Sequence, residues 1–279
     1  MGRSTIGAAV ILVLLAACGG AGAGDTAGGS HRTSSPSSKS PSVSASPQLT
    51  QRQFLRGSKA VRFRTSDGVR LAGRVFGHGP TAVVLSHMGP QGQDQTEWWP
   101  LARGLADHGY RVLTYDYRGI CPGGVAGCSK GSLVDIKATT RDLAAAVAFM
   151  RRSGSRRVVL GGASWGSVLS IDAASRPDAP FEALFSLSGV ELAGGFDLDR
   201  DVTRRIRIPK LFVAGRYDDE AAQSATDWGK WSRPPVATRI LDTGLHGTDM
   251  IDLASGADAD IPGKVTDLVL TFLGRFAPA

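Results

Sequence analysis

Cysteine, histidine and long apolar runs are all scarce in this sequence of 279 residues, which contains three Cys and five His. Structural zinc sites use four Cys or His ligands at short characteristic spacings, and no such group occurs here. The one pair of neighbouring cysteines, Cys121 and Cys128, has neither His nor a further Cys close to it in the sequence. We therefore expect no metal centre.

No basic cluster in the sequence of the folded part suggests a nucleic-acid footprint, although the chain has a formal net charge of +7. Residues 1–59 contain six Lys or Arg and one acidic residue, which leaves a net charge of about +2 for the remainder. Domains that bind nucleic acid concentrate positive charge on one face. The sequence therefore predicts no nucleic-acid partner. The basic N-terminal part is either a solvated tail or a segment with modest attraction to anionic lipid headgroups.

Large apolar side chains are almost absent from residues 19–50, which consist mainly of Gly, Ala, Ser, Thr and Pro. Such a segment cannot bury enough apolar surface to offset the entropy that it would lose on ordering. We expect residues 18–59 to form a disordered tether. Residues 60–279 mix apolar runs with turn signals and are long enough to build one substantial core.

The N-terminus has the features of a targeting signal. Arg3 precedes an apolar run that ends at Cys18 and is too short for a comfortable transmembrane span, so residues 1–17 are predicted to be a signal peptide. Leu15-Ala16-Ala17-Cys18 resembles the lipobox of bacterial lipoproteins, in which the Cys is acylated and becomes the first mature residue. This resemblance implies export and a lipid anchor on the outer face of the bacterial cell membrane. A plain signal peptide with a chance Cys is the alternative.

Export would place Cys121 and Cys128 in an oxidising compartment, where a close pair of cysteines is most simply a disulfide. The spacer between them contains three Gly and one Pro, so it can fold back far enough for the bond to form. This loop follows a predicted strand that ends near Asp116. We therefore expect a Cys121–Cys128 bridge at the carboxyl end of this strand, where it would border a substrate pocket formed at the same end of the sheet.

Strand-like and helix-like segments alternate through the folded part, which predicts parallel βαβ units and a sheet covered by helices on both faces. The alternating pattern around Asp67-Gly68 predicts an antiparallel hairpin at the start. Between Gly189 and Ile208 the chain is short and polar, which leaves room for a minimal cap only. Further strands are expected in 81–87, 110–119, 156–164, 181–189, 208–215 and 236–243, and helices in 96–109, 133–154, 165–175, 219–231 and 259–276.

Residues 162–166 read Gly-Ala-Ser-Trp-Gly, a G-x-S-x-G pattern. With 36 Gly in the chain the pattern alone is weak evidence, but it lies where a buried strand meets a predicted helix. That is the setting of a nucleophile elbow, a sharp turn that exposes a serine at the carboxyl end of a sheet. The two flanking glycines would let strand and helix pack closely. We expect Ser164 to be a nucleophile; a Gly-rich loop that closes a strand is the alternative.

A serine nucleophile needs a base that is itself oriented by an acid. His246 is the one histidine after Ser164, and it lies in a Gly-rich loop behind the last predicted strand. The acid should follow the strand that ends at Gly215, where Asp218 and Asp219 are neighbours. The spacing G-x-x-D favours Asp218, whereas Asp219 could serve as a helix cap.

These features resemble the α/β-hydrolase superfamily over about residues 60–276. In addition, "VVLSHMG" is similar to the family's strand and His-Gly turn, with Met88 in place of the usual Gly, and "YDYRG" is similar to its D-x-R-G turn. The resemblance is closest to compact esterases and dienelactone hydrolases. It implies a mostly parallel sheet of about eight strands, an oxyanion hole formed by the N–H of Trp165 and that of Gly89 or Met88, and a structural role for His87.

The expected reaction is acyl transfer from an ester through an acyl-enzyme on Ser164, and this chemistry needs no cofactor. Trp98, Trp99 and Trp165 are candidates for an apolar wall, or else for core positions. We expect a monomer that acts on a small-molecule or lipid ester at the cell envelope. An envelope acyltransferase, a peptidase and a non-catalytic ligand-binding lipoprotein are the alternatives.

Overall fold

The computed structural model describes residues 54–89, 93–121, 128–254 and 258–279. Contacts divide the chain into residues 1–44 and 45–279, and all described residues belong to the second unit. The predicted signal peptide and Cys18 lie outside the described residues. Within the described part, no helix is both long enough and apolar enough to span a bilayer.

An eight-stranded sheet forms the centre of the domain, in the order β1-β2-β4-β3-β5-β6-β9-β10. The first three strands in this order pair antiparallel and all the others pair parallel, which confirms the predicted sheet and its leading hairpin. The strands are β1 Lys59–Arg64, β2 Arg70–Phe76, β3 Thr81–Ser86, β4 Arg111–Tyr115, β5 Arg157–Ala163, β6 Ala183–Leu187, β9 Lys210–Gly215 and β10 Val236–Leu241. Residues 54–58 form a turn ahead of β1.

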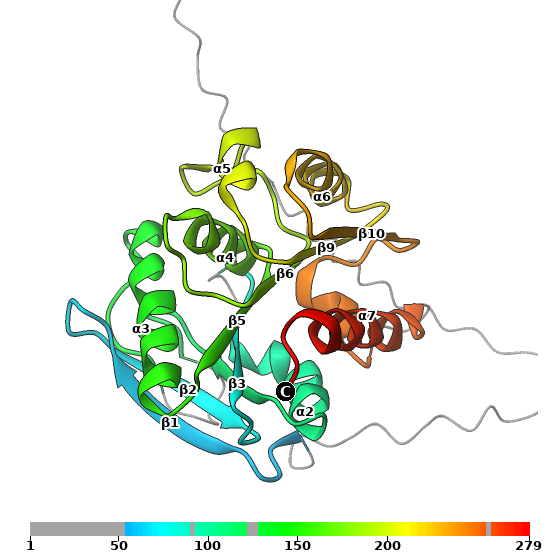
Figure 1. Cartoon of the computed structure of the whole chain (residues 1–279). Helices are drawn as coiled ribbons and strands as arrows, with labels where there is room; N and C mark the ends of the chain where they lie inside the picture. Colours follow the sequence, from blue (N-terminus) through cyan, green and yellow to red (C-terminus); the bar gives the residue numbers. More distant parts are fainter. Residues whose placement is uncertain (1–53, 90–92, 122–127, 255–257) are drawn as a thin grey trace, which may run out of the picture. The chain divides into compact units, whose positions relative to one another are not determined.

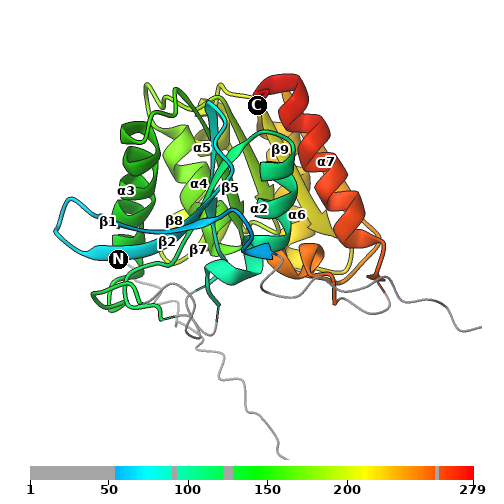
Figure 2. The same cartoon turned by 90° about the horizontal axis from the view of Figure 1, so that it is seen from below.

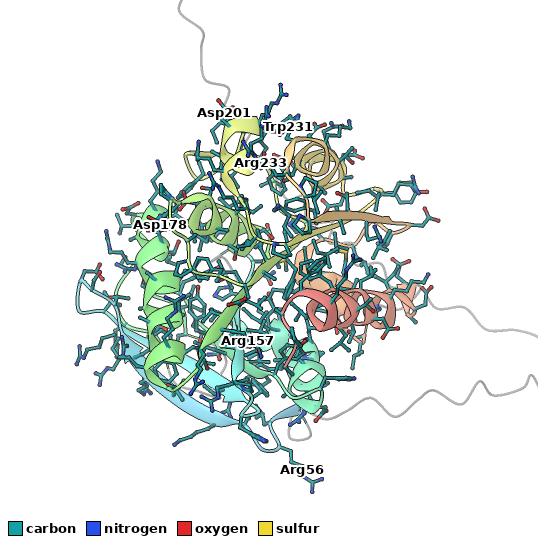
Figure 3. All side chains as sticks on the ribbon, in the orientation of Figure 1. Arg56, Arg157, Asp178, Asp201, Trp231 and Arg233 are labelled. Carbon is teal, nitrogen blue, oxygen red and sulfur yellow. A yellow bond between two sulfur atoms is a disulfide. The ribbon has the colours of Figure 1, made fainter. Side chains whose placement is uncertain are left out.

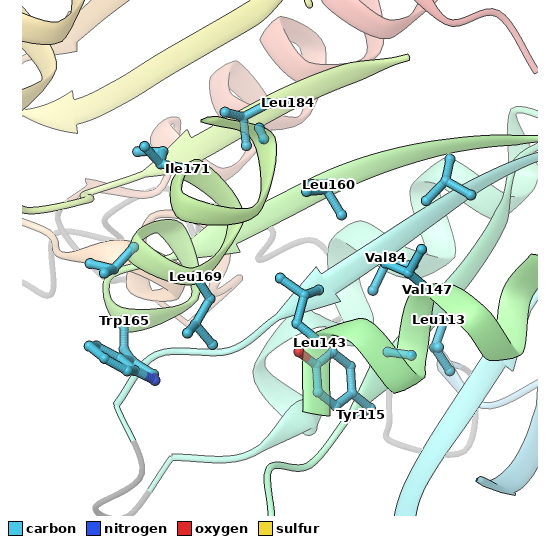
Figure 4. Close-up of a cluster of buried hydrophobic side chains, with 14 of the residues drawn as sticks. Val84, Leu113, Tyr115, Leu143, Val147, Leu160, Trp165, Leu169, Ile171 and Leu184 are labelled. Atoms are coloured by element: carbon cyan, nitrogen blue, oxygen red, sulfur yellow. The ribbon is translucent and has the colours of Figure 1, made fainter. Parts of the chain in front are cut away.

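Helices cover both faces of this sheet (Figure 1). One core cluster joins the sheet to α3, α4, α5 and α6, and Figure 4 shows part of it. A second cluster joins the other face to α2, α7 and the 3₁₀ helix η3. The helices are η1 Gln95–Trp98, α2 Trp99–Asp107, η2 Ile136–Ala138, α3 Thr139–Arg152, α4 Trp165–Ser175, α5 Arg200–Arg205, α6 Asp219–Trp231, η3 Gly247–Ile251 and α7 Ile261–Phe276.

The parallel strands are continuous apolar runs because both of their faces are buried. Every residue of β3, β6 and β9 is buried, whereas β1 alternates between exposed and less exposed positions at the sheet edge. Since these parallel strands run in one direction, the sheet has a carboxyl edge, where they end, and an amino edge, where they start. The C-terminus of the chain lies at the amino edge (Figure 2), where Thr81 Oγ1 donates to the carbonyl of Pro278 at 2.6 Å.

One predicted helix starts later than its pattern indicated. We expected helix over 133–154, but α3 begins at Thr139 after the short 3₁₀ helix η2. The side chain of Asp135 accepts a hydrogen bond from the N–H of Lys137 at 2.9 Å and so caps η2. A short Asp side chain that bonds nearby backbone favours such a start over a continuous helix.

Arg118, in the D-x-R-G turn, ties three separate segments together at the carboxyl edge. Its guanidinium donates to Oδ1 of Asp142 in α3 at 2.8 and 3.0 Å and to Oδ2 at 3.3 Å. It also reaches Asp67 of the leading hairpin at 2.8 Å. Asp142 is fully buried and Arg118 nearly so. A buried carboxylate in this position needs its cation, so the pair fixes where the hairpin and α3 meet the turn after β4.

Candidate active site

Ser164 lies in a strained turn between β5 and α4. Its backbone has φ 49° and ψ −113°, a region that side chains other than Gly rarely adopt and that is typical of functional turns. A Cβ on Gly162 would overlap the carbonyl of Gly166, and a Cβ on Gly166 would overlap that of Ser86 at the end of β3. The flanking glycines are therefore required by the close approach of β5, α4 and β3.

The side chain of Ser164 is partly exposed at the carboxyl edge, at the N-terminus of α4. The first N–H groups of a helix have no partner within it, and they favour negative charge nearby. Within the described residues, the Ser164 hydroxyl makes no hydrogen bond. Hydrogen bonds to a catalytic base are often long before substrate binds, so this geometry is compatible with a nucleophile.

Asp218 and His246 meet at the same edge of the sheet. Asp218 follows β9, His246 follows the neighbouring parallel strand β10, and Oδ2 of Asp218 lies 2.8 Å from Nδ1 of His246. This hydrogen bond raises the pKa of His246, and partial burial of the ring works in the opposite direction. With Nδ1 held by the carboxylate, Nε2 is the nitrogen left to exchange a proton with a substrate or nucleophile.

Asp219 does not share this contact. It is the first residue of α6 and is exposed, and no hydrogen bond joins its side chain to His246. The structure thus brings Asp218, rather than Asp219, to the histidine. Since the backbone of Asp218 precedes the helix, a one-residue step along the chain sends the two carboxylates in different directions.

Gly247 links the histidine loop to the serine turn. A Cβ on Gly247 would lie 3.5 Å from that of Ala163 and would overlap the sulfur of Met88. The neighbours of His246 and Ser164 are therefore packed against each other, with Met88 beside them. Gly247 has φ +56°, the left-handed conformation that glycine adopts most readily.

The predicted oxyanion donors lie around the same point. Trp165 is the first residue of α4, and Met88 and Gly89 follow the end of β3. Gly166 packs directly against the carbonyls of Ser86 and His87, so the start of α4 and the turn after β3 are neighbours. Backbone N–H groups from these two segments can converge on one oxygen atom.

His87 is fully buried, and burial lowers its pKa to about 3. Its Nε2 accepts the N–H of Tyr117 at 3.4 Å, and its carbonyl accepts the Tyr117 hydroxyl at 2.8 Å. A histidine that stays neutral and bonds only to backbone and a neighbouring tyrosine supports the turn structurally.

The three tryptophans have different surroundings. Trp98 and Trp99 are buried in the core cluster under α2. Trp165 donates through Nε1 to Thr139 Oγ1 at 3.1 Å and packs edge-on against Phe196, with ring centroids 5.6 Å apart. Phe196 belongs to a small antiparallel hairpin, β7 Leu192–Ala193 and β8 Phe196–Asp197. This hairpin and α5 occupy the whole interval between β6 and β9, as the predicted minimal cap requires.

Glu97 is a half-buried acid near the site that no sequence pattern indicated. It accepts a hydrogen bond from Thr248 Oγ1 at 2.9 Å, two residues after His246. Burial raises its pKa to about 7, and the nearby carboxylates of Asp94 and Asp249 act in the same direction. Glu97 belongs to η1, 151 residues earlier in the chain, and no local pattern could have joined it to the histidine loop.

The predicted disulfide is present: Cys121 and Cys128 are bonded, with their Cα atoms 4.2 Å apart. The residues between them lie outside the described part. The base of this loop is held by Ser129, whose hydroxyl donates to the carbonyl of Asp116 and accepts the N–H of Ala72, both at 2.8 Å. The loop therefore starts at the carboxyl edge, and its contact with the substrate stays a prediction.

Comparisons with known proteins agree with this architecture. No curated protein sequence matches the chain significantly. An esterase of Pyrococcus furiosus superposes with a TM-score of 0.66 at 18% identity, covering 83% of this chain and 97% of the esterase. A serine hydrolase of Xanthomonas campestris, described as having no lid, gives 0.59 at 19%, covering 84% and 99%. The esterase domain of a Rhodothermus marinus protein gives 0.59 at 16%, covering 78% and 98%.

At these identities the structural likeness establishes the fold and not the substrate. The sequence itself gives the stronger result, because residues 81–233 match the profile of the alpha/beta hydrolase fold family. That span begins at β3 and includes the serine turn, β9 and Asp218. The chain therefore belongs to the alpha/beta hydrolase fold family.

Proposed function

We propose that the protein is a serine hydrolase that cleaves carboxylic esters, with Ser164 as nucleophile, His246 as base and Asp218 as the acid that orients it. The observation that carries this proposal is the 2.8 Å contact between Asp218 and His246 at the edge where Ser164 is held in a strained turn. A binding protein on the same fold has no need for a carboxylate–imidazole pair at the sheet edge that carries a partly exposed serine.

In the proposed reaction, Nε2 of His246 accepts the proton of Ser164 as its oxygen attacks the ester carbonyl. The negative charge that forms on the carbonyl oxygen is stabilised by the N–H groups of Trp165 and of Gly89 or Met88. His246 then gives its proton to the leaving alcohol, and an acyl group remains on Ser164. A water molecule, activated by the same histidine, releases the carboxylic acid and restores the serine.

The small interval between β6 and β9 supports an open site. The β7–β8 hairpin and α5 are the elements there, so small esters or esters presented on a surface would have direct access to Ser164. Transfer of the acyl group to an alcohol instead of water uses the same residues, and the choice depends on which acceptor reaches the acyl-enzyme.

Anchoring to the cell envelope is a separate part of the proposal, and it depends on Cys18 in the lipobox-like segment. Growth of the host with labelled palmitate should label the intact chain and leave a Cys18→Ala variant unlabelled. Equal labelling of the two proteins would refute the anchor and leave the catalytic proposal untouched.

A fluorophosphonate probe tests the nucleophile, because it reacts covalently with activated serines. The full chain should be labelled at Ser164, and labelling should be lost in Ser164→Ala and strongly reduced in His246→Ala. Ser167 provides the control, because it lies in the first turn of α4 and its hydroxyl donates to the carbonyl of Gly162. Ser167→Ala should still react. Folded protein that does not react with the probe would favour a non-catalytic role. Rates with p-nitrophenyl acetate, with and without added alcohols, would then separate hydrolysis from acyl transfer.

A further inference from the structure

A cavity of about 580 Å³ lies at the amino edge of the sheet, away from Ser164. It is formed where α4 and α5 end and where the chain leaves α6 for β10, and Figure 3 labels Asp178, Asp201 and Arg233 around it. Its volume falls within the range of sites that bind small molecules. Five arginines line this cavity together with two carboxylates: Arg176, Arg204, Arg205, Arg207 and Arg233, with Asp178 and Asp201.

Most of these guanidinium groups have no partner within the described part of the chain. Arg176 forms an ion pair with Asp172 at 2.6 Å. The side chains of Arg204, Arg205, Arg207 and Arg233 make neither an ion pair nor a hydrogen bond to described residues. Each guanidinium offers five N–H donors in a fixed planar arrangement that suits phosphate and carboxylate oxygens.

A buried lysine adds positive charge behind the arginines. Lys210 is fully buried at the start of β9, and its ammonium donates to the carbonyl of Arg233 at 2.6 Å. Burial lowers its pKa to about 8, so the group is still mainly charged at neutral pH. Lys210 thus holds the turn that carries Arg233, with carbonyl groups as its partners in place of a carboxylate.

Charge on this half of the molecule is strongly separated between the two edges. The turns that lead into β5, β6, β9 and β10 (residues 151–157, 176–182, 204–208 and 230–236) contain ten Arg or Lys and two carboxylates. The loops that follow β6, β9 and β10 (188–199, 216–220 and 242–252) contain nine carboxylates and one Arg. This basic cluster is not evident in the sequence, because the arginines are scattered over four turns that only the fold brings to one edge.

Helix dipoles explain part of this pattern, since cations are favourable at the ends of helices and anions at their starts. Arg204 and Arg205 occupy the last turn of α5 and fit that explanation. Arg207 and Arg233 do not, because each lies past the cap residue that follows its helix, Ile206 after α5 and Ser232 after α6. Both side chains are exposed, so solvent can satisfy their donors, and the informative observation is that they converge on one cavity.

We propose that this cavity binds phosphate-bearing anions at a site separate from the catalytic centre. Two sources share this chemistry: soluble phosphorylated compounds and the headgroups of anionic phospholipids. In either case phosphate oxygens would accept charge-assisted hydrogen bonds from Arg207 and Arg233. The acidic carboxyl edge would repel the same anions, so binding is directed to the amino edge. The site does not depend on the proposed ester hydrolysis.

The test uses the full chain in a Cys18→Ala background, so that no lipid anchor contributes. Pyrophosphate is titrated calorimetrically in a phosphate-free buffer, and vesicles that contain phosphatidylglycerol are compared with vesicles of phosphatidylcholine alone by co-sedimentation. The cavity variant is Arg207→Gln/Arg233→Gln. The control Arg152→Gln/Arg156→Gln removes the same charge from exposed positions in the same set of turns, outside the cavity. Thermal unfolding verifies that both variants fold.

We expect the cavity variant to bind about tenfold more weakly or worse, and the control to change affinity less than about twofold, because two direct phosphate contacts are lost only in the former. Binding should also weaken as salt is raised. A cavity-dependent response to pyrophosphate identifies a soluble ligand, and one to phosphatidylglycerol vesicles alone identifies a headgroup. The proposal is overturned if neither probe binds, or if both variants weaken binding equally.

Discussion

Replacing Asp218 by Asn, in comparison with the same change at Asp219, tests which of the two neighbouring acids acts on His246. The substitution keeps the size of the side chain but removes the charge 2.8 Å from Nδ1, and an amide can also donate to that nitrogen and so favour the wrong tautomer. Loss of the acid in comparable triads costs on the order of 10⁴ in kcat, which corresponds to about 5.5 kcal/mol of transition-state stabilisation. We expect a loss of this order for Asp218→Asn.

Asp219→Asn is the matched control. Its carboxylate is exposed in the first turn of α6 and interacts mainly with the helix dipole, worth about 0.3–1 kcal/mol of stability. Because it does not touch His246, kcat should stay within about twofold of the unsubstituted protein. The assay is hydrolysis of p-nitrophenyl acetate at saturating substrate, with thermal unfolding to verify that both variants fold.

The pH profile gives an independent readout. His246 must be neutral to accept a proton, so activity rises with pH through its pKa, which the hydrogen bond to Asp218 raises above the ordinary value. Without that carboxylate, burial of the ring remains and lowers the pKa. The residual activity of Asp218→Asn should therefore appear at lower pH than that of the unsubstituted protein. An unchanged acid limb, or a larger loss in Asp219→Asn, would refute the assignment.

Three further substitutions test the supports of the site. Arg118→Gln should lower the free energy of unfolding in urea by about 3–5 kcal/mol, because it leaves the buried carboxylate of Asp142 without its cation. Arg141 is half exposed, so Arg141→Gln should cost at most about 1 kcal/mol. Similar costs for the two substitutions would contradict this reasoning. Gly166→Ala should abolish fluorophosphonate labelling or folding, since its Cβ would overlap a β3 carbonyl, and normal labelling would show that the turn can relax. The half-buried Glu97, whose pKa is raised to about 7, makes the folded state less stable as pH rises from about 4.5 to 7. Glu97→Gln should therefore flatten the fall in urea-unfolding stability over that range, and an unchanged slope would argue against this reasoning.

Much of the fold followed from local pattern. The apolar runs of β3, β6 and β9 are long enough to identify buried parallel strands, and the turn at Asp67-Gly68 identifies the hairpin. The helix starts were less predictable, because a capping side chain such as Asp135 can replace a helical turn with a 3₁₀ segment. Such competition is decided by a single hydrogen bond, which apolar periodicity does not report.

The residues of the candidate site also differ in whether sequence alone could place them. Ser164, Asp218 and His246 each follow a strand in the chain order of the fold, so their positions could be inferred from sequence alone. The position of Glu97 at the site could not be inferred, because it depends on a hydrogen bond to Thr248, 151 residues later in the chain. Similarly, the ion pair between Arg118 and Asp142 is visible only once α3 packs beside the turn after β4.

The separation of charge between the two sheet edges follows from topology more than from composition. In a parallel sheet every strand starts at the amino edge and ends at the carboxyl edge. The connections therefore alternate between the two edges along the chain. Acidic residues in the loops after β6, β9 and β10 and arginines in the turns into β5, β6, β9 and β10 therefore average to a small net charge in sequence but add to two opposed fields in space. The proposed active site lies on the acidic edge, so a neutral or cationic ester should reach Ser164 more readily than an anionic one. Comparing neutral and anionic p-nitrophenyl esters of equal acyl length should show kcat/KM falling for the anion at low salt and recovering as salt is raised, and no such recovery would mean that the edge charge does not steer substrate.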